Sequence, residues 1–224
     1  MLLVEDELVR SGLAVLNVDQ AGWGESRLSG NRYRSLDDAR MLADRVLSYC
    51  QQNASIDATR VALFGFSGGG TWAAMIAGTD ARFRWLVTVG GAIYDLGESV
   101  RRLPAMQKRQ LMKHWGCREA EVEGMLRELK LNDLLPNITA RCLLVHGEHD
   151  TLVPVDNVRA AARLIAGPVD LQVVPGGDHM CSATLRDDQL PYIMEWLRTN
   201  LLRSEPRPAG RPAEHESVTS RNLR

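Results

Sequence analysis

Short apolar runs alternate along this chain with longer segments of helical periodicity, and the alternation restricts the folds that it can adopt. Each run has the length of one buried strand. The runs occupy residues 13–18, 60–66, 84–90, 141–147 and 169–175. Helices are expected over residues 2–10, 35–52, 67–77, 155–165 and 185–202. Strands that alternate with helices in this way form a parallel sheet covered on both faces. We therefore predict an α/β fold with a mostly parallel sheet.

The 224 residues suit one domain with a sizeable core. We predict that residues 1–203 form this domain. The polar, helix-prone stretch 93–137 interrupts the alternation between two strands, where a small helical lid would cover one end of the sheet. Residues 204–224 show no apolar periodicity, and we predict that they form a disordered tail.

The composition argues against several classes of partner. Formal net charge is −1, so neither nucleic acid nor an anionic membrane is expected to bind. Neither a membrane-spanning apolar run nor a signal-peptide pattern can be read, which favours a cytoplasmic protein. No cofactor or metal is expected, because neither a dinucleotide motif nor metal-ligand spacing is found. The four cysteines are scattered without a CxxC pair: Cys50, Cys117, Cys142 and Cys181.

A single serine lies among glycines in the stretch FGFSGGGTW, between a predicted strand and a predicted helix. Ser67 would be held on a sharp turn with strained backbone angles, and Gly65 and Gly69 would remove the clashes of that turn. The N–H of Gly68, at the start of the helix, would face a developing oxyanion. A plain turn with a structural serine is the alternative reading of such a short motif.

A serine hydroxyl needs a base within hydrogen-bond reach before it can act as a nucleophile. Because ligands bind at the carboxyl ends of parallel strands, the residues that follow each strand are the informative ones. His179 follows the last strand in the glycine-rich loop PGGDHM, and Asp150 follows strand 141–147. We predict that His179 is the base for Ser67 and that Asp150 orients His179.

Other acids and histidines compete for these roles. Glu148 lies near Asp150, and Asp156 is interpreted as a charge at a helix N-terminus. His146, at a strand end, is interpreted as a core residue or a support for a site residue. His149 is interpreted as a bystander in a loop and Asp178 as a solvated turn residue.

Four stretches together resemble the α/β-hydrolase superfamily: LAVLNVDQAGWGES, VALFGFSGGG, CLLVHGEHDTLVP and PGGDHM. They lie in the superfamily's order between residues 13 and 182. The chain is most similar to the branch of 2,6-dihydropseudooxynicotine hydrolase, fungal polyketide-shortening hydrolases and related esterases. The loop that resembles D-G-P-G-x-G-E-S in that branch is DQAGWGES here, residues 19–26.

The resemblance implies a serine hydrolase that acts on an ester or an activated carbon–carbon bond of a small organic substrate. Prolyl-oligopeptidase-type peptidases share much of the pattern, so a peptidase is an alternative. Trp23, between glycines, and Tyr94, at the start of the lid, are candidate substrate contacts. The alternatives for them are a hydrophobic plug and local helix packing.

The chain also departs from this fold. The run at 13–18 resembles its fourth strand, so the first three strands and a loop with half of the oxyanion hole are expected to be missing by N-terminal truncation. A homo-oligomer in which another chain fills the gap is one consequence that we keep open. A catalytically silent fold that acts in binding or assembly is the third functional reading.

Overall fold

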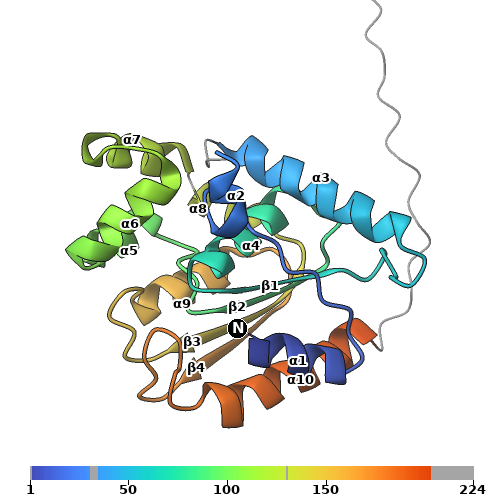
Figure 1. The fold of residues 1–224 in the computed structure, drawn as a ribbon. Coiled ribbons are helices and arrows are strands. Elements are labelled where there is room, and N and C mark those ends of the chain that lie inside the picture. The colour runs from blue at the N-terminus through green and yellow to red at the C-terminus, as the bar shows by residue number, and fades with distance from the viewer. Residues whose placement is uncertain (1, 31–34, 130, 203–224) are drawn as a thin grey trace, which may run out of the picture.

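The computed structural model describes residues 2–30, 35–129 and 131–202, which form helices around one parallel sheet (Figure 1). The strands are paired in the order β1-β2-β3-β4, each parallel to the next. Four of the predicted strands are thereby confirmed, with ends displaced by at most two residues. They are β1 (Ala62–Phe66), β2 (Trp85–Val89), β3 (Arg141–Gly147) and β4 (Val169–Val174).

The fifth predicted strand is not present, and the prediction for residues 13–18 is wrong. This segment is coil, and its larger side chains Val15, Leu16 and Val18 are 36%, 42% and 44% exposed. A strand exists only where its N–H and C=O groups pair with a neighbour. Within the described residues β1 pairs with β2 alone, so no strand lies next to residues 13–18 to complete such a ladder.

The predicted helices outside the lid are confirmed. Ser35 caps α3 in a capping box, because its hydroxyl accepts from Asp37 N–H while its own N–H donates to Asp38. A short helix that was not predicted, α2, begins where Glu25 N–H donates to the Asp19 carboxylate at 2.8 Å. These helices are α1 (Leu2–Arg10), α2 (Gly24–Leu28), α3 (Leu36–Gln52), α4 (Gly68–Thr79), α9 (Val155–Leu164) and α10 (Leu190–Leu197), the last flanked by the π-helical turns η2 (Leu185–Gln189) and η3 (Arg198–Leu202).

Alternate side chains of the central strands point to opposite faces of the sheet, and both faces are covered (Figure 1). Leu86 and Leu144 pack against α4 and α9 on one face. Val87 and Leu143 pack against α1 and α10 on the other. All four side chains are fully buried, so the sheet lies inside the molecule with an apolar layer on each side.

The stretch predicted as a lid is helical. It leaves β2 and returns to β3, and Figure 1 shows α5 to α7 standing beyond one end of the sheet. Its elements are α5 (Leu96–Arg102), α6 (Ala105–Trp115), α7 (Glu119–Leu129), α8 (Leu131–Leu134) and the 3₁₀ turn η1 (Leu135–Asn137). That it acts as a lid stays a prediction, and the predicted tail 204–224 lies outside the described residues. None of the helices described is long and apolar enough to cross a membrane.

Replacing Leu144 by alanine tests the core of the sheet. Leu144 is 0% exposed on β3, so L144A should lower the free energy of unfolding by about 2–5 kcal/mol. Leu28, which is 78% exposed, provides the matched control. L28A should change the free energy of unfolding by about 0.5 kcal/mol or less. Urea titrations followed by circular dichroism would measure both, and equal effects would contradict the packing described here.

Candidate functional site

Ser67 occupies the turn between β1 and α4 in a backbone conformation that L-residues rarely adopt. Its φ is 48° and its ψ is −121°. The turn is so tight that a Cβ on Gly65 would lie 2.2 Å from the carbonyl oxygen of Gly69. Glycine at position 65 therefore lets β1 run directly under the start of α4, and the turn lifts the Ser67 side chain above the strand end.

The role predicted for Gly69 is wrong, and Gly70 has it instead. A Cβ on Gly69 would meet no atom within 4 Å, so a side chain fits there. A Cβ on Gly70 would lie 3.1 Å from the Gly65 carbonyl oxygen and 3.2 Å from Gly91. The crowded positions face the sheet, whereas Gly69 faces away from it, an orientation that the sequence does not specify.

The structure brings the three predicted side chains together. The Ser67 Oγ lies 2.7 Å from His179 Nε2, and His179 Nδ1 lies 2.8 Å from Asp150 Oδ2. An ionised carboxylate only accepts hydrogen bonds, so His179 Nδ1 carries a proton and donates a hydrogen bond to Asp150. The other ring nitrogen, Nε2, is then free to accept the hydrogen bond of the Ser67 hydroxyl.

Asp150 is buried but remains ionised. Burial is the largest influence and acts to raise the pKa of this carboxyl, whereas the hydrogen bonds from His179, Val153 N–H and Leu152 N–H act to lower it. Together they hold the pKa of Asp150 below its usual value. Two of these donors, the N–H groups of Leu152 and Val153, bind Oδ1 at 2.8 Å each.

The loop that carries His179 rests directly on the ends of β2 and β3. A Cβ on Gly90 would lie 2.0 Å from the carbonyl oxygen of His179, and a Cβ on Gly147 would lie 2.0 Å from that of Asp178. The absence of side chains at both strand ends therefore allows this loop to approach until the His179 ring reaches both Ser67 and Asp150.

The competing residues lie elsewhere or do other work. Glu148 accepts from Gly176 N–H at 3.1 Å, and Asp156 pairs with Arg159 in the first turn of α9. Asp178 accepts from two backbone N–H groups of its own turn, and His149 is exposed. His146 is different, because it is buried and its Nε2 lies 3.3 Å from Asp150 Oδ2.

The two predicted substrate contacts lie at the lid. Trp23 stacks on His114 of α6, with ring centroids 4.0 Å apart and planes 13° from parallel. His114 Nδ1 also donates to Gly22 O at 2.7 Å, so a lid helix holds the loop of residues 19–23. Tyr94 lies just before α5 and is partly buried. His114 was not identified from the sequence, where it stands alone on a helix.

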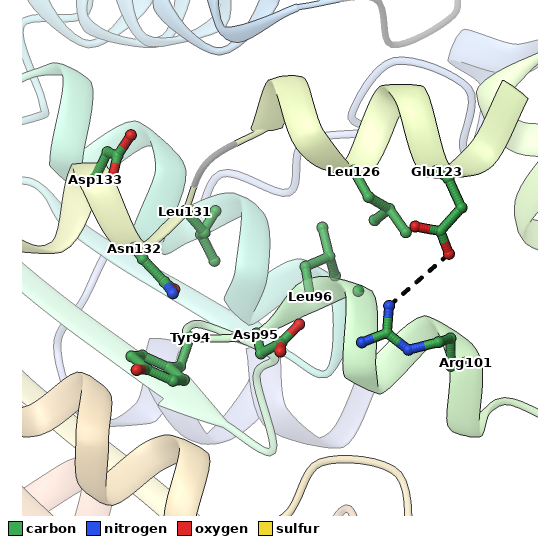
Figure 2. A pocket seen from close by; sticks show the side chains of 10 residues that line it. Tyr94, Asp95, Leu96, Arg101, Glu123, Leu126, Leu131, Asn132 and Asp133 are labelled. Carbon is green, nitrogen blue, oxygen red and sulfur yellow. Dashed lines mark ion pairs between the residues drawn. The ribbon is translucent and has the colours of Figure 1, made fainter.

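A pocket of about 410 Å³ opens beside Tyr94 (Figure 2). Figure 2 shows Tyr94 at one end and the Arg101–Glu123 ion pair, 3.8 Å apart, at the other. Its lining comes from α5, α7, α8 and the turn before α5: Tyr94, Asp95, Leu96, Gly97, Arg101, Glu123, Leu126, Leu131, Asn132 and Asp133. Ser67, Asp150 and His179 are not part of that lining. No local sequence signal marks a pocket assembled from separate segments.

Over residues 2–30, 35–129 and 131–202, no group of three or more His, Cys, Asp or Glu side chains is arranged to hold a metal ion. Burial raises the pKa of Cys142 to about 12 and that of Cys181 to about 11, so both are unreactive thiols near neutral pH.

Alanine substitutions at Gly65 and Gly69 should have opposite effects on stability. G65A places a Cβ against the Gly69 carbonyl and should cost about 1–3 kcal/mol. G69A adds a good helix former in open space and should be neutral or stabilise by up to about 1 kcal/mol. Denaturant unfolding of the two variants would show this, and a destabilised G69A would contradict the geometry of the turn.

The lowered pKa of Asp150 should make stability depend on pH. The carboxyl is more acidic folded than unfolded, so it stabilises the fold above about pH 4, and this contribution is lost as the pH falls through the folded pKa. The difference in unfolding free energy between the wild type and Asp150→Asn should therefore shrink from pH 6 to pH 3. Asp156→Asn, at a side chain that is 85% exposed, is the control. A difference that stays constant across this range would argue against the effect.

Solved structures with similar folds span much longer chains. A structure described as 2,6-dihydroxy-pseudo-oxynicotine hydrolase has a TM-score of 0.79 at 23% identity, over 94% of this chain and 60% of that one. A structure of AbyA5 gives a TM-score of 0.71 at 20% identity, over 88% and 55% of the two chains. A structure of an acylaminoacyl peptidase from Pyrococcus horikoshii has a TM-score of 0.60 at 17% identity, over 75% of this chain and 28% of that one. This chain thus spans about 60% or less of these three proteins.

No curated protein matches the chain in sequence. The fold of the similar structures is that of the α/β-hydrolase superfamily, which confirms the predicted fold class. The model of the prolyl oligopeptidase family matches residues 36–203, a range that contains β1 to β4 together with Ser67, Asp150 and His179. The chain therefore belongs to the prolyl oligopeptidase family within the α/β-hydrolase superfamily.

Proposed function

We propose that this chain is a serine hydrolase in which Ser67 is the nucleophile, His179 the general base and Asp150 the residue that orients His179. The observation that carries the proposal is the continuous set of contacts from Ser67 Oγ to His179 Nε2 at 2.7 Å and from His179 Nδ1 to Asp150 Oδ2 at 2.8 Å. These are the distances that proton transfer from a nucleophile to a base requires.

Ser67, His179 and Asp150 have different roles in the proposed reaction. The Ser67 Oγ attacks the substrate carbonyl carbon while its proton passes to His179 Nε2. The resulting imidazolium is stabilised by the ionised Asp150, which stays a carboxylate throughout. His179 then returns the proton to the leaving group. His179 next deprotonates a water molecule that attacks the acyl carbon, and it gives this proton to Ser67 Oγ as the bond between Oγ and the acyl group breaks.

The N–H of Gly68 is the proposed donor to the oxyanion. Gly68 is the first residue of α4, and it is exposed, with no atom within 4 Å of the place where its Cβ would be. A substrate carbonyl can therefore approach the start of α4, whose N-terminal N–H groups favour negative charge. A second donor would lower the barrier further, because each such donor contributes about 10²–10³ in rate.

The substrate class proposed is a small organic ester or a compound with an activated carbon–carbon bond. The structural similarity to 2,6-dihydroxy-pseudo-oxynicotine hydrolase, over 94% of this chain, favours it. Trp23 and Tyr94 are the proposed substrate contacts, because Tyr94 lies in the lid region and Trp23 stacks on His114 of the lid helix α6. We further propose a cytoplasmic protein that needs no cofactor, and a homo-oligomer as its assembled form.

A peptidase is the second proposal, and the family match favours it. The prolyl oligopeptidase model covers residues 36–203, and one similar structure is an acylaminoacyl peptidase. A catalytically silent protein, acting in binding or assembly, is the third reading.

Labelling by a fluorophosphonate probe, together with p-nitrophenyl acetate turnover, tests the proposal. The wild type should be labelled at one residue and should hydrolyse the ester. Ser67→Ala should lose the label and at least about 10³-fold in kcat, because it removes the nucleophile. Ser48→Ala, at an exposed position on α3, is the matched control and should behave as the wild type.

Three outcomes separate the three readings. Ester turnover that depends on Ser67, with no cleavage of peptide anilides, supports the small-molecule hydrolase. Faster cleavage of peptide anilides than of esters favours the peptidase. If the protein has a native circular dichroism spectrum but shows no labelling and no turnover, the serine hydrolase is rejected and the binding module remains.

A further inference from the structure

Asp150 uses its two carboxylate oxygens for different contacts. Oδ1 accepts the N–H groups of Leu152 and Val153, both at 2.8 Å, which ties the carboxylate to its own turn. Oδ2 accepts from His179 Nδ1 at 2.8 Å. A second ring nitrogen, His146 Nε2, lies 3.3 Å from the same Oδ2. Asp150 therefore lies between two histidines, although the proposed reaction uses only His179.

His146 is held in one tautomer by its surroundings. It is 1% exposed near the end of β3, and its Nε2 lies 2.8 Å from the carbonyl oxygen of Val153. A carbonyl oxygen only accepts hydrogen bonds, so His146 Nε2 carries a proton and donates a hydrogen bond to Val153 O. The same N–H presents its positive end to Asp150 Oδ2.

His146 closes the turn that contains Asp150. The N–H of Val153 donates to Asp150 Oδ1, and the C=O of Val153 accepts from His146. Val153 is thus bound on both sides of its backbone, once to the carboxylate and once to the ring on β3. Because β3 lies between β2 and β4, this ring connects the turn to a strand that is paired on both sides.

A neutral ring suits this place better than a charged one. The groups that face His146 are the Val153 carbonyl, the Asp150 carboxylate and His179. Burial is the main cause that lowers the pKa of His146, and the nearby His179 acts in the same direction. A neutral His146 donates a hydrogen bond to the turn, and it does not compete with the His179 imidazolium for the negative charge of Asp150.

We propose that His146 is a positioning residue, which holds the turn of residues 150–153 so that Asp150 Oδ2 stays aligned with His179 Nδ1. The proposal rests on the serine hydrolase function proposed above. A ring that only filled space would need no polar partner. Here the buried Nε2–H of His146 donates to the carbonyl oxygen of Val153 and faces the carboxylate of Asp150. Without this N–H, both acceptors would lose a donor at a place that water does not reach.

A matched pair of variants isolates the N–H from the volume of the ring. In His146→Gln the amide nitrogen reaches the position of His Nε2 and can donate to Val153 O. His146→Met has a side chain of the same length without a donor. We expect H146M to lose about tenfold or more in kcat for p-nitrophenyl acetate, because small displacements of a catalytic group are costly, and H146Q to stay within about threefold of the wild type. KM should be unchanged in both, since His146 is placed behind Asp150 and not against the substrate.

Equal kcat values for folded H146M and H146Q would overturn the proposal, as would a loss confined to KM. Should either variant fail to fold, the wild type itself decides. Nitrogen-15 NMR of its imidazole groups should show His146 as the neutral Nε2–H tautomer from pH 6 to pH 8. An Nδ1–H tautomer or an imidazolium at that residue would reject the role. This measurement needs no turnover, so a protein without hydrolase activity would reject the proposed function separately from the placement of His146.

Discussion

The hydrogen-bond ladder of the parallel sheet continues past the strand ends, and the whole site depends on this continuation. Ser67 N–H donates to Val89 O at 2.8 Å, and Gly90 N–H donates to Val145 O at 3.0 Å. Glu148 N–H donates to Val174 O, also at 3.0 Å. Each loop therefore leaves its strand already bound to the neighbouring strand. Since parallel strands end at one edge, three loops of distant sequence begin there in fixed orientations.

Glycines then allow these loops to meet. Gly65 admits the backbone of α4, and Gly90 and Gly147 admit the loop that carries His179. At all three positions a Cβ would lie within 2.2 Å of a backbone oxygen, which a side chain cannot accommodate by rotation. Ser67 lies between these close approaches, and the surrounding backbone holds it at a positive φ that L-residues rarely adopt.

Sequence reasoning predicts most of this edge, because each of its signals is local. The apolar run at β3 and the glycines around Ser67 both indicate structure within a few residues, and the alternation of strands and helices along the chain indicates a parallel sheet. Residues 13–18 show where this fails, since an apolar run becomes a strand only beside a partner, and pairing is not written in the run itself. Gly69 and Gly70 show the same limit, because the crowded side of α4 is set by tertiary contacts.

The triad residues could be named from the sequence because each follows a strand, whereas His146 and His114 need the folded chain. His146 is separated by seven residues from the carbonyl that it binds, and its contact with Asp150 depends on how the loop turns back. His114 contacts Gly22 across 92 residues, between a lid helix and a loop that no strand pairing constrains. A sequence pattern that covers a few residues cannot show contacts across either separation.

These two histidines make contacts in different parts of the molecule. His146 connects the turn of Asp150 to β3, one of the two inner strands of the sheet. His114 ties Gly22 and Trp23 to α6, so the proposed substrate wall belongs to the lid. A Cβ on Gly22 would lie 2.2 Å from the His114 carbonyl oxygen, which makes loop and helix one packed unit. Changes in α6 would therefore reach the proposed substrate contacts before the side chains of Ser67, His179 and Asp150. Substrate contacts on a separate segment are one way in which a single fold can host different functions.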